Sequence, residues 1–169
     1  MKAFGRILLG VALALALPVL AASPSASAGE ATYAFRLNGA NTAVAPTGDE
    51  HCEPGDWIAV TGTGTFDPSA GMIQAGGVFK HYRADGTLHA KGTWFATGFV
   101  SFIDFGGGRA IRHGGRLELV VTHEHDGITH EGLAMTVTSS IRAPEEATPG
   151  VTVGPFTVPT GGDSVFSQL

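Results

Sequence analysis

The chain has 169 residues, a formal net charge of −5 at pH 7 and a single cysteine, Cys52. The acidic balance argues against nucleic acid as a partner, and one cysteine excludes an internal disulfide, so the fold must be held by its core. The sequence contains 25 glycines, and apolar residues do not recur at helical spacing beyond the N-terminal segment. Both features favour an all-β domain with many turns.

The N-terminus has the features of a secretory signal peptide. The basic residues Lys2 and Arg6 precede an apolar run too short to span a bilayer comfortably, and Ala26-Ser27-Ala28 fits the small-x-small cleavage rule. We therefore expect a signal peptide over 1–28 and a single secreted domain over 29–169, which is extracellular, or periplasmic where there is an outer membrane. Loss of the two basic residues leaves 8 basic against 15 acidic residues, a charge of −7. No later apolar stretch has membrane length.

Strand patterns follow one another at hairpin spacing and leave no room for crossover helices. The expected strands are Thr32–Leu37, Asp56–Phe66, Met72–Arg83, Thr87–Phe99, Arg116–His125, Thr129–Ile141, Val151–Val158 and a short edge piece, Ser164–Leu169. Val100–Phe105 is a continuation of the fourth strand or a fifth strand. Residues 38–55 and 106–115 are expected to be loops, and Gly76-Gly77 a bend or bulge. The fold class is a single antiparallel β-barrel of about eight strands, with a β-sandwich as the alternative.

One stretch resembles a known family. Gly62–Gly71, GTGTFDPSAG, followed by Gly76-Gly77, resembles the Gly-Thr-Gly-x-Phe-x-x-Ala-x-Gly segment of plant dirigent proteins, and a related glycine-rich strand-turn-strand occurs in allene oxide cyclases. The longer segment Asp56–Phe105 is similar to one found in uncharacterised exported bacterial proteins. The resemblance implies an eight-stranded barrel with an apolar cavity that guides cyclisation or coupling of small hydrophobic molecules without a redox cofactor. In dirigent proteins the segment lies late in the chain, whereas here it lies early, and no catalytic residue is carried over.

Seven histidines are many for this length, and five of them lie in two expected hairpins. Histidine binds metals and moves protons near neutral pH. A two-residue turn at Asp126-Gly127 pairs His123 with His130 and His125 with Ile128. The three imidazoles then share one face and form a candidate metal site.

The register set by the two-residue turn divides the apolar residues of the hairpin between two faces. It places Leu133, Met135 and Val137 on the face opposite to that of Leu117, Leu119 and Val121. A three-residue turn with Gly127 in the left-handed conformation restores a single core face, with His123 and Glu131 pointing inward and His130 outward. We favour this bulged register because of the core.

The hairpin around Asp85-Gly86 holds two further candidates, His81 and His89. A three-residue turn pairs His81 with His89, whereas a two-residue turn pairs Tyr82 with His89, and the alternation of side chains does not decide between them. If both imidazoles face inward they can act as acid, base or ligand in a barrel lumen; otherwise they are surface residues. The candidate catalytic residues are His81, His89, His123 and Glu131.

Two other groups of residues attract attention. The loop segment Asp49-Glu50-His51-Cys52-Glu53 gathers acids, an imidazole and a thiol, but its spacing matches no established metal site. Large aromatic residues either line a cavity for a planar apolar ligand or fill the core; the candidate ligand-binding residues are Trp57, Phe79, Trp94 and Phe99. No cofactor signature is present, and we expect no cofactor.

Three functions are therefore open. The first is a secreted barrel that binds a small, largely apolar molecule and catalyses a cofactor-free isomerisation or cyclisation, with a histidine that handles a proton. The second is an exported metal-binding protein that uses the hairpin histidines His123, His125 and His130. The third is a structural or interaction module that uses exposed loops and a C-terminal edge strand. No nucleic acid or membrane partner is expected after signal cleavage.

Overall fold

The computed structural model describes residues 31–107 and 111–169, so the expected signal peptide over 1–28 and part of the loop expected over 106–115 lie outside the described residues. All regular structure in the described part is β. The strands are β1 (Tyr33–Val44), β2 (Trp57–Asp67), β3 (Met72–Tyr82), β4 (Leu88–Gly107), β5 (Arg112–His125), β6 (Ile128–Thr138), β7 (Gly150–Val153) and β8 (Val158–Gln168).

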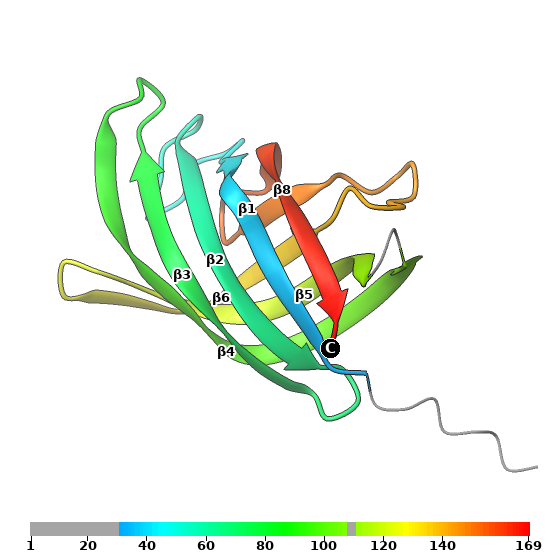
Figure 1. Ribbon diagram of the computed structural model, residues 1–169. Helices are drawn as coiled ribbons and strands as arrows, with labels where there is room; N and C mark the ends of the chain where they lie inside the picture. Colours follow the sequence, from blue (N-terminus) through cyan, green and yellow to red (C-terminus); the bar gives the residue numbers. More distant parts are fainter. Residues whose placement is uncertain (1–30, 108–110) are drawn as a thin grey trace, which may run out of the picture.

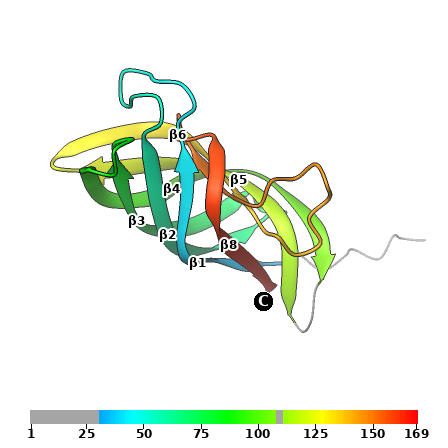
Figure 2. The same ribbon diagram turned by 90° about the horizontal axis from the view of Figure 1, so that it is seen from above.

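The eight strands form one antiparallel sheet in the order β4-β3-β2-β1-β8-β5-β6-β7, and an additional pairing of β4 with β5 curls the sheet back on itself. The ring is completed by a short pairing of β5 with β8 at Arg112 and His113. In Figure 1, β1, β2, β3 and β8 form the near wall, and β5 and β6 cross behind it; Figure 2 shows the same curl from above. The expectation of an all-β antiparallel barrel is confirmed.

Two expected elements at the ends of the chain have different bounds. The first strand does not end at Leu37: β1 continues to Val44 across an irregularity at positions 38–40, where Gly39 adopts a φ of 70°. The segment 38–55, expected to be one long loop, is therefore half strand. The C-terminal piece expected at an edge is the full strand β8, which pairs with β1 along its length. On its other side, within the described residues, β8 pairs with β5 only at Phe166 and Ser167.

The glycines at the middle of β2 and β3 have a packing role. Gly76-Gly77, expected as a bend or bulge, pairs in regular register with both β2 and β4. A side chain at Gly62 or Gly77 would overlap the Trp94 indole, which is 1 % exposed. The Trp94 Nε1–H donates a hydrogen bond to the Thr61 carbonyl oxygen at 2.9 Å. Glycine is therefore needed here so that a buried indole can lie directly on the backbone.

The barrel interior has two unlike halves. One half is filled by a cluster of aromatic rings: Tyr33 and Phe66 lie with ring centroids 5.4 Å apart, Phe66 and Phe102 4.8 Å, and Phe102 and Phe166 5.2 Å. The other half, toward the start of β2 and the end of β3, is not filled. No helix in the described residues is long and apolar enough to cross a membrane.

Candidate functional site

A cavity of about 250 Å³ occupies the unfilled half of the barrel. Its apolar wall comes chiefly from Ile58, Phe79, Leu133, Val153 and Phe156. Six of the seven histidines of the chain also line it: His51, His81, His89, His123, His125 and His130. Four separate segments contribute these imidazoles, namely the loop after β1, the end of β3 with the start of β4, the end of β5, and β6.

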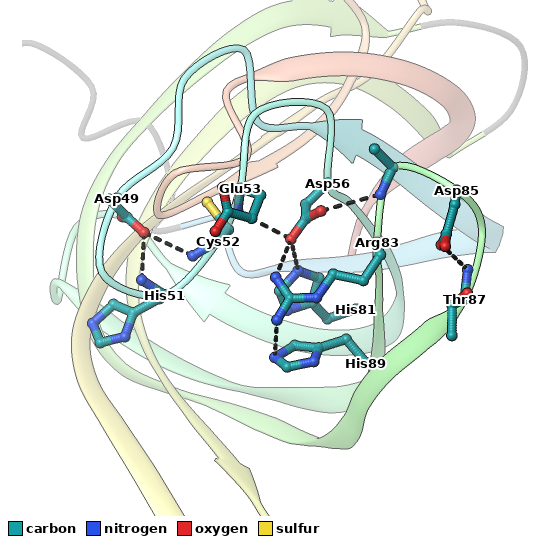
Figure 3. Close-up of polar contacts among 11 residues, drawn as sticks. Asp49, His51, Cys52, Glu53, Asp56, His81, Arg83, Asp85, Thr87 and His89 are labelled. Carbon is teal, nitrogen blue, oxygen red and sulfur yellow. Dashed lines mark hydrogen bonds and ion pairs between the residues drawn. The ribbon is translucent and has the colours of Figure 1, made fainter.

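On one side of the cavity, the imidazoles are held by a buried carboxylate. Asp56, 1 % exposed, accepts hydrogen bonds from His81 Nε2 at 3.1 Å and from Arg83 Nη1 at 2.9 Å. Its two oxygens also accept the backbone N–H groups of Glu53 and Ala84, both at 3.1 Å. Figure 3 shows the four donors converging on this carboxylate, with His89 below Arg83. We call Asp56, His81, Arg83 and His89 the Asp56 network.

The hydrogen bonds fix the charge states within the Asp56 network. Burial alone would raise the pKa of Asp56, but the hydrogen bonds from Glu53, His81 and Arg83 outweigh it and hold the pKa below its usual 3.8. Burial lowers the pKa of His81 below 6.5, although the hydrogen bond to Asp56 opposes this shift. An ionised Asp56 therefore faces a neutral His81 near pH 7, and His81 Nε2 carries the proton that it donates.

His89 enters the network through a bulge. His81 pairs with Ala90 and Tyr82 with Leu88, so His89 is the extra residue of β4 between the two pairs. Neither register expected from the sequence is the observed one. The bulge brings the rings of His81 and His89 to 4.8 Å, edge to face, and places His89 Nε2 at 3.2 Å from Arg83 Nη2. Because a guanidinium only donates, His89 Nε2 accepts and its proton lies on Nδ1.

On the other side of the cavity, the β5–β6 hairpin combines both registers that the sequence left open. A two-residue turn at Asp126-Gly127, with φ of 48° and 77°, pairs His123 with His130. A bulge opposite Thr122 then shifts the register, so that Val121 pairs with Leu133 and the core face is restored. The preferred single register was therefore wrong about His130 and Glu131: His130 lines the cavity, and Glu131 is exposed.

We call His123, His125, His130 and the adjacent loop residue His51 the hairpin cluster. His125 Nε2 lies 3.3 Å from His130 Nε2, and the rings of His51 and His130 are 4.8 Å apart. His123 is 6 % exposed and stacks on Phe79 at 4.4 Å. Its Nε2 and the Nδ1 of His125 are buried without a hydrogen-bond partner in the described structure. Buried polar atoms without a partner are uncommon in native proteins and need an explanation.

Two imidazoles of the hairpin cluster, His123 and His130, are neutral near pH 7. Burial, followed by the proximity of His130 and His125, lowers the pKa of His123 to about 4. The pKa of His130 is also lowered, first by burial and then by His51 and His125. Within the described residues, no three His, Cys, Asp or Glu side chains are arranged around one point as a metal site.

Most of the expected ligand-binding aromatics lie elsewhere. Phe79 lines the cavity, but Trp57 stacks on Tyr82 at 4.0 Å, Trp94 fills the core, and Phe99 packs on the aromatic cluster, 6.1 Å from Phe66. Trp94 belongs to the hydrophobic core and Phe99 packs against it, as large residues of a small barrel usually do. Cys52 is buried, and burial followed by Asp49 raises the pKa of its thiol to about 11, so it is an inert thiol near neutral pH.

Sequence reasoning missed Asp56 and Arg83, the centre of the Asp56 network. A signal was available, because the tight turn after Asp67 sets the register of β2 against β3. That register pairs Trp57 with Tyr82, and one step further along each strand it brings Asp56 beside Arg83. An acid and a base at matched positions, next to a histidine in the same hairpin, would have indicated the network.

No family model, curated protein or solved structure matches the chain. The resemblance to dirigent proteins and allene oxide cyclases therefore stays a prediction, and the function has to be argued from the cavity itself.

Proposed function

We propose that the protein, once exported, binds a small, largely apolar molecule in the histidine-lined cavity and catalyses a cofactor-free proton transfer on it, of the kind that an isomerisation or cyclisation requires. The observation that carries this proposal is the Asp56–His81 pair at the wall of an apolar cavity. An imidazole oriented by a buried carboxylate is a recurring arrangement for a general base.

The cavity sets the size and character of the ligand. An apolar cavity of about 150 Å³ accommodates benzene, so the cavity of about 250 Å³ suits a molecule of roughly ten non-hydrogen atoms. Phe79, Phe156 and Leu133 offer an apolar surface for a flat ring. The imidazoles supply the few polar contacts that orient a ligand within an otherwise apolar site.

His81 is the residue best placed to take a proton. Its Nε2 is committed to Asp56, so the unprotonated Nδ1 is the atom that can act as the base. Burial keeps His81 neutral before reaction. When it takes a proton, the adjacent Asp56 carboxylate stabilises the imidazolium that forms, and Arg83 keeps that carboxylate ionised.

His89 can complete an acid–base pair. Its Nε2 accepts from Arg83, which leaves Nδ1–H as a donor, and its ring lies 4.8 Å from that of His81. A ligand in the cavity beside both rings could lose a proton to His81 and receive a hydrogen bond from His89 at the oxygen that gains charge. Such a reaction rearranges bonds without a change of oxidation state, which is consistent with the absence of a cofactor signature in the sequence.

A nitro-substituted benzisoxazole is a suitable probe because it is planar, apolar and opens to a coloured phenolate when a base removes its ring C–H proton. The proton passes to the base as the N–O bond breaks, so atoms and charge balance without another reactant. We expect the chelator-treated protein to open the probe faster than free imidazole at the same concentration. His81→Gln should lower the rate at least tenfold, in line with the usual contribution of a general base of about 100-fold or more.

The matched control is His113→Gln. His113 lies in the aromatic half of the barrel, 5.8 Å from Tyr33, and does not line the cavity. Its replacement should leave the rate unchanged. Equal rates in wild type and His81→Gln, or a rate no faster than that of free imidazole, would refute the proposed role of His81 as the base.

A further inference from the structure

The hairpin cluster differs from the Asp56 network because its imidazoles are not held by a buried carboxylate. Its four imidazoles come from three segments, and none of them is hydrogen-bonded to a buried carboxylate. Two buried ring nitrogens, His123 Nε2 and His125 Nδ1, have no partner in the described structure. A neutral imidazole carries its proton on one ring nitrogen and a lone pair on the other, and such lone pairs are ligands of transition metals.

The distances between His125 and His130 are compatible with a shared metal ion. Two imidazole nitrogens bound to one tetrahedral ion at about 2.0–2.1 Å are about 3.3 Å apart, and their ring centroids are about 5.2 Å apart. The observed Nε2–Nε2 distance is 3.3 Å, and the ring centroids are 5.3 Å apart. A head-on N–H···N hydrogen bond at the same nitrogen separation would place the centroids further apart, at about 5.6 Å.

A third nitrogen is within reach. The His51 ring lies 4.8 Å from that of His130, and its side chain is 48 % exposed on a loop, so it can rotate without disturbing the core. His51 has to move, because no three ligand side chains in the described part of the chain already surround one point. His123 lines the same cavity, and its Nε2 has no hydrogen-bond partner in the described structure.

Acidic groups surround the cluster without filling it. Glu50 Oε1 lies 3.3 Å from His51 Nε2, and Asp126 Oδ2 lies 3.7 Å from His125 Nδ1. A carboxylate behind a ligating histidine orients the ring and makes the opposite nitrogen a better ligand. Asp126 has this position relative to His125, whose Nε2 faces His130.

We propose that His125 and His130, with His51 as a third ligand, form a binding site for a first-row transition-metal ion such as Zn²⁺ or Cu²⁺. Imidazole ligands select these ions over Mg²⁺ and Ca²⁺, which take oxygen ligands. Three imidazoles would leave a fourth coordination position on such an ion for water or a small ligand. This inference does not depend on the proposed role of His81, whose Nε2 is already bonded to Asp56.

The test is calorimetric titration of chelator-treated protein with Zn²⁺. We expect one ion per chain with a Kd of about 1 μM or tighter, equivalent to about −8 kcal/mol. Removal of a residue behind a ligand costs about 10-fold to 100-fold in affinity. We therefore expect Asp126→Asn to weaken binding about 10-fold, and His125→Ala or His130→Ala to weaken it more than about 100-fold.

His89→Ala is the matched control, because His89 lines the same cavity but its Nε2 is bonded to Arg83. It should bind Zn²⁺ as tightly as wild type. His130→Gln separates loss of the metal ligand from unfolding of the protein. It should keep the wild-type circular dichroism spectrum and lose metal binding. A second readout is the visible absorption of bound Co²⁺, which is intense for a four-coordinate ion and should disappear in His130→Gln.

Two outcomes would overturn the metal site. The first is wild-type protein that binds Zn²⁺ no tighter than about 100 μM. The second is His125→Ala and His130→Ala variants that bind as tightly as His89→Ala, which would leave the 3.3 Å contact as a hydrogen bond between two imidazoles. Neither result bears on the benzisoxazole assay, which uses metal-free protein and His81.

Discussion

The two histidine groups of the cavity satisfy their ring nitrogens in opposite ways. In the Asp56 network, His81 Nε2 and His89 Nε2 are both bonded, one to a carboxylate and one to a guanidinium. In the hairpin cluster, His123 Nε2 and His125 Nδ1 are buried with no partner in the described structure. A buried polar atom without a partner costs about 1–3 kcal/mol. The first group therefore stabilises the folded chain, whereas the second reduces its stability unless something binds there.

The first prediction concerns Asp56, the carboxylate that accepts the hydrogen bond from His81 Nε2 in the Asp56 network. Asp56→Ala should lower the free energy of unfolding by about 3–5 kcal/mol, because it leaves Arg83 and three other donors without their acceptor. Urea unfolding at pH 7 measures it. The control is Asp85→Ala, which removes an exposed turn carboxylate that accepts only from Thr87 and should cost less than about 1 kcal/mol. Equal losses in the two variants would show that the Asp56 network does not stabilise the fold.

The second prediction uses acid to charge the hairpin cluster. The folded pKa of His123, about 4, is below the usual 6.5, so the unfolded chain binds the proton first as the pH falls. Stability should be lost between about pH 6.5 and pH 4, by about 3 kcal/mol from this residue, because each pKa unit is worth about 1.4 kcal/mol. The measurement is urea unfolding of the metal-free protein at pH 7.5 and pH 4.5, in wild type and in His123→Phe.

His123→Phe should keep the stacking on Phe79 and lose most of this acid dependence. The other titratable groups that line the same cavity are Glu50, His51, His81, His89, His125 and His130. They remain in the variant, so a residual slope is expected. The Asp56 carboxylate does not contribute in this window, since its pKa lies below 3.8. An undiminished slope in His123→Phe would assign the acid sensitivity to another group.

The third prediction tests how the charge within the Asp56 network sets the basicity of His81. Arg83 lowers the pKa of His81, after burial and the adjacent His89, so Arg83→Gln should raise it. It should also cost about 1–2 kcal/mol of stability, because one hydrogen bond to a charged group is lost from a side chain that is 37 % exposed. NMR titration of the His81 ring measures the pKa. Arg116→Gln, which removes an exposed pair with Glu118, should leave that pKa unchanged.

Comparison of the Asp56 network with the hairpin cluster also shows which features of the structure could be predicted from the sequence. The all-β barrel, the turn at Asp126-Gly127 and the core face of Leu117, Leu119 and Val121 follow from alternation and turn chemistry. The bulges at His89 and opposite Thr122 do not, because one extra residue in a strand leaves no periodic signal. Those two bulges decide which histidines reach the cavity.

The cavity itself was predictable only as a possibility. Aromatic residues such as Trp94 and Phe99 could line it or fill the core, and which they do depends on how glycines such as Gly62 let a ring lie on the backbone. His51 is separated from the β5–β6 hairpin by β2, β3 and β4, and the loop after β1 brings it to His130. Long-range proximity of this kind is not encoded in local pattern.

The smallest effect on stability is expected for His125→Ala in metal-free protein. Its ring is half-buried, and its Nδ1 has no partner, so its loss removes packing and relieves an unsatisfied atom at the same time. We expect a change within about 1 kcal/mol by urea unfolding, whereas His81→Ala, which breaks the bond to Asp56, should cost about 2 kcal/mol or more.

Addition of Zn²⁺ should stabilise His81→Ala but not His125→Ala, the reverse of their order in metal-free protein. An ion that binds only the folded state at 100 times its Kd stabilises it by about 2.7 kcal/mol. Wild type and His81→Ala should gain this stability on addition of Zn²⁺, and His125→Ala should not. If His125→Ala gained as much as wild type, the ion would be bound elsewhere and the contact between His125 Nε2 and His130 Nε2 would be a hydrogen bond only.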